Sequence, residues 1–198
     1  MHPEMKGLIL TGGKSKRMGG DKAELEYHGK PQAVYLLEIL ERIGVPAFIS
    51  CKAGDSDRWL PHRTIEDKAS GFGPMAGIMA AFSQDPDSTL LVIACDYPLL
   101  REQDIRWLIA QRDPGRAVTA VSLKAGLGEP LLAIWEPRAF PVLVDAFASE
   151  NYKMMDVLSK LDVNLARPDD PRFFKQANDP QARNEAHEFL RKLSSGKD

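Results

Sequence analysis

A glycine-rich, basic segment near the start of the chain has the residue types that bind phosphate groups. Two glycine pairs, Gly12-Gly13 and Gly19-Gly20, lie close together there. Glycine lets the backbone approach a ligand closely, and successive N–H groups in such a loop form an anion-binding nest. The whole chain has 26 Lys and Arg against 28 Asp and Glu, so composition does not explain the local excess of cations. We therefore expect a polyanion here, such as a nucleotide triphosphate. The cations are Lys14, Lys16, Arg17 and Lys22.

The loop matches neither of two common nucleotide-binding patterns. It contains no GxxxxGK[ST], which excludes the P-loop, and no GxGxxG, which excludes the dinucleotide fingerprint. A solvated glycine-rich turn with surface lysines is the alternative interpretation. The apolar run Met5–Leu10 leads directly into the loop and predicts a buried parallel strand. This placement at a strand end favours the phosphate site.

Asp96 is the strongest single candidate for chemistry. It follows Thr89–Ala94, the most apolar predicted strand of the chain, and stands within Cys95-Asp96-Tyr97-Pro98. A buried carboxylate is costly without a partner, and Mg²⁺ uses one or two carboxylates together with phosphate oxygens. The alternative is an aspartate that only caps a turn. We expect Asp96 to bind Mg²⁺.

The segment Leu10–Lys22 closely resembles the signature loop of the molybdenum cofactor guanylyltransferases, members of the nucleotidyltransferase superfamily with a Rossmann-like fold. The resemblance implies that the loop wraps the triphosphate of GTP and that Lys22 contacts phosphate. Cys95-Asp96-Tyr97-Pro98 resembles the family's Cys-Asp-x-Pro motif, whose aspartate binds the metal. The implied catalytic residues are Arg17, Lys22 and Asp96.

Three further segments resemble family motifs. Gly73-Pro74-Met75-Ala76-Gly77 is similar to Gly-Pro-Leu-Ala-Gly, Glu129-Pro130-Leu131 is similar to an acceptor-side segment, and Gln176–Pro180 is similar to Asn-x-Asn-Thr-Pro. The resemblance implies an acceptor side made of Gly73, Pro74, Glu129, Pro130 and Asn178. It implies a nucleotide side made of Leu10, Thr11, Gly12, Gly13, Lys22, Ser50, Asp67 and Asp96.

The chain departs from the family pattern in places. Thr11 stands where alanine is common, and Ser50 stands where some members have an asparagine near the base or ribose. Gln176 replaces the first asparagine of the C-terminal element. Without the resemblance, Asp67 is a turn residue and Asn178 or Asp179 is a helix cap.

Apolar strands alternate with helical patterns along the chain, which predicts an α/β three-layer sandwich with a mostly parallel sheet. Ligands bind such sheets beyond the carboxyl ends of the strands, where Thr11–Gly13, Ser50, Asp67 and Asp96 fall. The strands are predicted at 5–10, 46–51, 64–67, 89–94, 117–122 and 131–135, with a glycine-rich loop over 124–129 and a further extended piece at 162–167. The helices are predicted at 31–44, 71–83, 102–112, 137–149, 152–161 and 179–193.

Length and composition predict one domain over residues 1–198. The resemblance implies that residues 1–100 mainly bind the nucleotide and 101–198 mainly the acceptor. Hydrophobic residues make up 43% and charged residues 27%, as in soluble globular proteins. The net charge of −2 argues against binding to nucleic acid or to anionic membranes. No apolar run approaches the roughly 20 residues that span a bilayer.

The compartment is predicted from two further features. The N-terminus lacks a signal-peptide pattern, and Cys51 and Cys95 have no zinc or CxxC spacing. We therefore expect a cytoplasmic protein in which both cysteines act as small apolar residues. The histidines show no pairing and are expected to face solvent or to be incidental: His2, His28, His62 and His187.

The resemblance implies transfer of GMP from Mg·GTP to molybdenum-bound molybdopterin, with release of pyrophosphate. The resemblance also implies partners among other molybdenum cofactor biosynthesis proteins and apo-molybdoenzymes. Two alternatives within enzymes are a cytidylyltransferase acting on the same pterin and a nucleotidyltransferase acting on a sugar phosphate. A catalytically silent GTP-binding cofactor carrier is the alternative from another class.

Overall fold

A computed structural model describes residues 4–11, 22–67 and 71–195 of the chain. Its centre is a seven-stranded sheet in the order β3-β2-β1-β4-β6-β5-β7. Only β6 runs antiparallel to its neighbours, so the mostly parallel sheet predicted from the sequence is confirmed. The strands are β1 (Met5–Leu10), β2 (Ala47–Lys52), β3 (Thr64–Asp67), β4 (Thr89–Ala94), β5 (Val118–Lys124), β6 (Leu127–Trp135) and β7 (Val163–Ala166).

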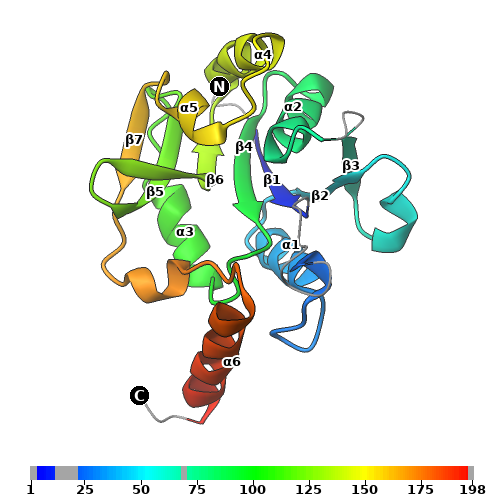
Figure 1. Ribbon diagram of the computed structural model, residues 1–198, viewed down its shortest axis with the longest axis vertical. Coiled ribbons are helices and arrows are strands. Elements are labelled where there is room, and N and C mark those ends of the chain that lie inside the picture. Colours follow the sequence, from blue (N-terminus) through cyan, green and yellow to red (C-terminus); the bar gives the residue numbers. More distant parts are fainter. Residues whose placement is uncertain (1–3, 12–21, 68–70, 196–198) are drawn as a thin grey trace.

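Helices cover both faces of the sheet, giving three layers (Figure 1). Side chains from α1 and α3 share one apolar core with the sheet, and side chains from α2, α4 and α5 share the other. The C-terminal helix α6 extends away from the sheet, and only Ala186 of it is buried. The helices are α1 (Gln32–Arg42), α2 (Pro74–Gln84), α3 (Glu102–Ala110), α4 (Phe140–Ala148), α5 (Met154–Leu158) and α6 (Pro180–Ser194), with short 3₁₀ turns η1 (Lys22–Glu24), η2 (Ser56–Trp59), η3 (Pro137–Ala139) and η4 (Pro171–Phe174).

The two central strands bring the predicted site segments side by side. β1 and β4 pair in parallel from Met5 opposite Thr89 to Leu10 opposite Ala94. All six residues of β4 are buried, because helices pack on both faces of the sheet. The loop that follows Leu10 and the Cys-Asp segment that follows Ala94 therefore begin at the same edge.

The second half of the chain differs from the prediction. The glycine-rich loop expected over 124–129 is only a short turn at Ala125-Gly126, because β5 and β6 extend to meet there. Gly126 allows the turn through its positive φ of 76°. Glu129 and Pro130 consequently lie inside β6 and not in a loop before it. The two strands shift register near Val121, and Pro130 precedes the stretch of β6 that pairs with β4.

Several smaller expectations need correction. Trp59 is buried in the core, whereas the neighbouring Leu60 is 71% exposed. The helix expected at 152–161 is the single short α5, and η4 was not predicted. In the part of the chain that the structure describes, no helix is long and apolar enough to cross a membrane. Cys51 and Cys95 are buried thiols, in agreement with their predicted role as small apolar residues.

Candidate active site

The ends of β1, β2 and β4 meet through direct contacts at one edge of the sheet. Leu10 stands opposite Ser50 on one side and Ala94 on the other. The Thr11 hydroxyl donates a 2.6 Å hydrogen bond to the Ser50 carbonyl, and the Cys95 amide donates a 3.1 Å bond to the Leu10 carbonyl. Four of the predicted nucleotide-side residues thus lie together at the carboxyl ends of the strands, as expected from the predicted fold. They are Leu10, Thr11, Ser50 and Asp96.

Lys22 and Asp96 form the charged centre of this edge. The Lys22 ammonium Nζ lies 3.7 Å from Asp96 Oδ2, and the two side chains are only 19% and 16% exposed. The other carboxylate oxygen, Asp96 Oδ1, is buried without a hydrogen-bond partner among the described residues. Burial raises the pKa of Asp96 above its usual value, and the nearby Lys22 offsets only part of that rise. An unpaired buried oxygen of this kind is suited to a hard cation.

Lys22 also contacts the C-terminal element. Its ammonium donates a hydrogen bond to Asn178 Oδ1, and the amide of Ala177 donates a 2.8 Å bond to the Asp96 carbonyl. Asp179 caps α6 by accepting from the Ala182 amide at 2.8 Å, so the helix start fixes the segment just before it. The resemblance places Asn178 on the acceptor side of the site, and the structure puts it in contact with Lys22 at the end of the predicted phosphate loop.

A hydrogen-bonded row of side chains continues from Asn178. Asn178 Nδ2 donates to Gln176 Oε1 at 2.9 Å, and Gln176 Nε2 donates to the Tyr97 hydroxyl at 2.8 Å. Burial raises the pKa of Tyr97, and the nearby Glu129 carboxylate raises it further. Burial also raises the pKa of Glu129 above its usual value, and Asp96 adds to that rise. Glu129 thus lies near the Tyr97 end of the row, and Asn178 stands at the other end.

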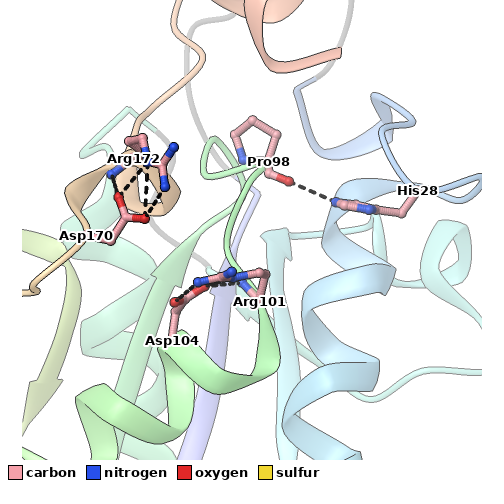
Figure 2. A network of polar contacts seen from close by, with 6 residues as sticks. All are labelled: His28, Pro98, Arg101, Asp104, Asp170 and Arg172. Carbon is pink, nitrogen blue, oxygen red and sulfur yellow. Dashed lines mark hydrogen bonds and ion pairs between the residues drawn. The ribbon is translucent and has the colours of Figure 1, made fainter. Parts of the chain in front are cut away.

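The segment after Asp96 is hydrogen-bonded to residues just before α1 and at the start of that helix (Figure 2). His28 Nε2 lies 2.8 Å from the Pro98 carbonyl while its ring stacks on Tyr35, and the buried Gln32 side chain donates to the Tyr97 carbonyl at 3.1 Å. His28 is therefore partly buried in a structural contact, which corrects the expectation that it faces solvent or is incidental. Burial is also the main cause of its lowered pKa.

The start of α3 anchors the other end of the same segment. The Arg101 guanidinium pairs with Asp104 at 2.8 Å and lies 3.1 Å from the centre of the Phe173 ring in η4. Arg172 of η4 forms an ion pair with Asp170, two residues before it in the chain (Figure 2). These contacts tie η4, and hence the chain leading to Gln176, to the segment that carries Asp96.

Asp67 stands at the far end of the edge, on β3. Lys52 is its partner in the register, so β2 and β1 separate it from β4. At about 4.8 Å per strand, Asp67 lies roughly 14 Å from the Asp96 position. Its Oδ1 is buried without a partner among the described residues, and burial raises its pKa. The edge has an acidic side chain, Asp67 or Asp96, at each end. It is therefore long enough for an extended ligand.

The glycine-proline element begins α2 beside this edge. Gly73, with a φ of 63°, is the N-cap and Pro74 is the first helical residue. Gly77 packs so closely on the sheet that an added Cβ would lie 2.3 Å from Ser50 Oγ. In the described residues, no hydrogen bond or ion pair joins Gly73 or Pro74 to Glu129, Pro130 or Asn178.

Some predicted residues lie outside the described part of the chain. They are Gly12, Gly13 and Arg17, together with the other loop residues at 14–16 and 18–21. Conversely, sequence reasoning did not select Tyr97, Gln32 or His28. A polar Gln32 at the otherwise apolar start of a helix was the one available signal.

Comparisons with known proteins agree with this geometry. Residues 7–165 match the MobA-like NTP transferase domain family. The chain is 31% identical over 180 residues to a "molybdenum cofactor biosynthesis bifunctional protein" of Synechocystis sp.; the match covers 88% of this chain and 51% of that protein, so the chain spans about half its length. It is 26% identical over 171 residues to a "probable molybdenum cofactor guanylyltransferase" of Flavobacterium johnsoniae, covering 86% of this chain and 89% of the relative.

Solved structures give the same picture. Molybdopterin-guanine dinucleotide biosynthesis protein A from Archaeoglobus fulgidus superposes with a TM-score of 0.77 at 25% identity, over 95% of this chain and 100% of that one. A 4-diphosphocytidyl-2C-methyl-D-erythritol synthase from Anaerococcus prevotii superposes with a TM-score of 0.68 at 11% identity, over 96% and 100%. The second likeness concerns the fold alone.

Proposed function

The chain belongs to the family of MobA-like NTP transferase domains, which confirms the resemblance seen in the sequence, and on this premise we propose that it transfers GMP from Mg·GTP to molybdenum-bound molybdopterin. The terminal phosphate oxygen of the acceptor attacks the α-phosphorus of GTP. The bond from that phosphorus to the bridging oxygen of the β-phosphate breaks, and pyrophosphate leaves with the electron pair. The observation that carries the proposal is the placement of Lys22 between Asp96 and Asn178.

No side chain needs to act as nucleophile or base, because the acceptor phosphate is already ionised. Catalysis then rests on positioning and on stabilising charge. Among the residues that the structure describes, Lys22 is the cation nearest the carboxylate of Asp96. It would offset the charge that grows on the α-phosphate. Loop amides and Arg17 would take the charge of the departing β- and γ-phosphates.

The residues at Asp96 fit a magnesium ion. The fit rests on Asp96 Oδ1, a buried oxygen without a hydrogen-bond partner in the described part of the chain, which is a hard ligand of the kind Mg²⁺ uses together with phosphate oxygens. When bound, the ion would supply positive charge beside the reacting phosphates. Asp96 would hold it there, and Lys22 would keep the second carboxylate oxygen oriented.

The remaining predicted residues complete the proposal. Leu10, Thr11, Gly12 and Gly13 would line the triphosphate and base, with Ser50 and Asp67 toward the base and ribose end. Gly73, Pro74, Glu129, Pro130 and Asn178 would form the acceptor side. Residues 1–100 would thus mainly bind GTP and 101–198 mainly the pterin, in a cytoplasmic protein that passes its product to other molybdenum cofactor proteins.

Product analysis tests the proposal. The protein is incubated with molybdenum-loaded molybdopterin and GTP, CTP or ATP, and both pyrophosphate and the dinucleotide product are measured. We expect the guanine dinucleotide and one pyrophosphate per product. Tight GTP binding without pyrophosphate release would instead indicate a cofactor carrier, and a cytosine product would indicate a cytidylyltransferase.

A further inference from the structure

The row of side chains from Lys22 to Tyr97 has a single direction of hydrogen bonding. Lys22 donates to Asn178, Asn178 donates to Gln176, and Gln176 donates to Tyr97. The row therefore runs from the start of η1, through the residues before α6, to the segment after β4.

The ammonium end accounts for this direction. An ammonium such as Lys22 only donates hydrogen bonds, so Asn178 faces it with its oxygen. The nitrogen of Asn178 then faces the oxygen of Gln176. This leaves the nitrogen of Gln176 for the Tyr97 hydroxyl, which accepts through a lone pair. Reversing either amide would place two donors or two acceptors together.

Burial at the Tyr97 end of the row gives this arrangement its strength. Tyr97 is 0% exposed, and its backbone carbonyl is fixed separately by Gln32, so the hydroxyl has little freedom to move. Hydrogen-bond networks away from water reinforce one another. At the other end the exposed Asn178 has no comparable burial, so its orientation depends on Gln176.

We propose that Tyr97 and Gln176 are positioning residues for Lys22: they set the orientation of Asn178 and thereby hold the Lys22 ammonium beside the reacting phosphate. The proposal rests on the proposed function, in which Lys22 stabilises the transition state. It assigns to Gln176 a role that does not depend on matching the family's asparagine.

A spectroscopic measurement tests the positioning without turnover. The protein is labelled with ¹⁵N-lysine, and the side-chain ammonium resonance of Lys22 is assigned by its loss in Lys22→Ala. We expect Tyr97→Phe and Gln176→Leu each to move or broaden this resonance. Tyr152→Phe is the matched control, because Tyr152 contacts Phe72 and Phe147 through its ring. An unchanged Lys22 resonance in both folded variants would overturn the proposal.

Kinetics supply the second readout. We expect Tyr97→Phe to lower kcat for GMP transfer about tenfold with less than about a twofold change in KM for GTP, because the lost interaction acts in the transition state. In a Lys22→Ala background the same substitution should cost less than about twofold. An equal tenfold loss in both backgrounds would show that Tyr97 acts independently of Lys22, which would overturn the proposal. A wild-type protein without any GMP transfer would contradict the proposed function, and the resonance measurement would still test the positioning.

Discussion

Lys22 Nζ lies 3.7 Å from one oxygen of Asp96, while the other oxygen of the same carboxylate is buried and has no partner among the described residues. The two residues come from segments that are far apart in the chain but adjacent in space, because β1 and β4 are neighbours in the sheet. One carboxylate oxygen is thus oriented by a cation of the protein, and the second is left available for a ligand.

Replacing Asp96 by asparagine tests that availability. Asp96→Asn keeps the shape of the side chain but removes its charge, so we expect turnover with Mg²⁺ to fall about 100-fold or more in a folded protein. The measurement is kcat for GMP transfer, with the melting temperature as the control for folding. Turnover close to wild type would remove Asp96 from the metal site.

The raised pKa of Asp96 also predicts how stability depends on pH in metal-free buffer. A carboxyl group whose folded pKa is raised favours folding most below its unfolded pKa of about 3.9, and this contribution is lost as the pH rises through the folded value. At pH 7 we therefore expect metal-free Asp96→Asn to melt at a higher temperature than the wild type, and the gap to close below about pH 4.

Calorimetry across that range measures the gap. Added Mg²⁺ should raise the melting temperature of the wild type more than that of Asp96→Asn, since only the wild type has the charged ligand. A wild type that is more stable than the variant at pH 7 without metal would show that the contact with Lys22 outweighs the cost of burial.

Lys22→Ala tests where the lysine acts. Negative charge on the α-phosphate grows during transfer, so the lost ammonium should weaken the transition state more than it weakens GTP binding. We expect kcat/KM to fall by more than the affinity for GTP, the latter measured by calorimetric titration. Equal losses in the two quantities would make Lys22 a simple binding residue.

Gly77→Ala tests the close packing of α2 on the sheet. Alanine in place of glycine favours a helix by about 1 kcal/mol, but the new Cβ would lie 2.3 Å from Ser50 Oγ and 2.9 Å from Leu10 Cδ2. Overpacking of this kind costs about 1–3 kcal/mol, so we expect a net loss of stability in urea denaturation.

The companion variant separates the clash from other causes. Adding Ser50→Ala removes the nearest atom, and it should recover part of the stability lost in Gly77→Ala. No recovery at all would show that the helix and the sheet do not meet at Ser50 in the way described.

Much of the site edge could be predicted from local sequence. The apolar runs at 5–10 and 89–94 require burial on both faces, and polar residues directly after such runs must lie at the carboxyl edge of the sheet. Thr11 and Asp96 were located in this way. The contact of Asn178 with Lys22 was not predicted, because nothing local in the sequence says which strand end the C-terminal element meets.

The parts that escaped prediction depend on tertiary contacts. Glu129 was expected at the end of a loop because Gly126 and Gly128 suggest one, yet Gly128 is buried inside β6 and Glu129 follows it in the same strand. Tyr97 is a variable position within its motif, and its role depends on Gln176 arriving from a segment about 80 residues away. His28 gave no signal because its partners are a backbone carbonyl and a single ring.

Nucleotide preference tests the central claim most directly. Thr11-Gly12-Gly13 and Cys95-Asp96 resemble the guanylyl-transferring branch of the family, whereas Ala-Ala-Gly and Gly-Asp at these two places would resemble the cytidylyl-transferring branch. Guanine offers donors at N1 and N2 beside the O6 acceptor, and a mismatched base leaves buried polar groups unpaired at about 1–3 kcal/mol each.

The measurement is kcat/KM for GTP, CTP and ATP with the same molybdenum-loaded pterin. Two mismatches predict a preference for GTP on the order of 100-fold or more, and Gly12→Ala should reduce the use of GTP more than that of CTP. A value for CTP that equals or exceeds the value for GTP would contradict the guanylyl assignment and favour a cytidylyltransferase.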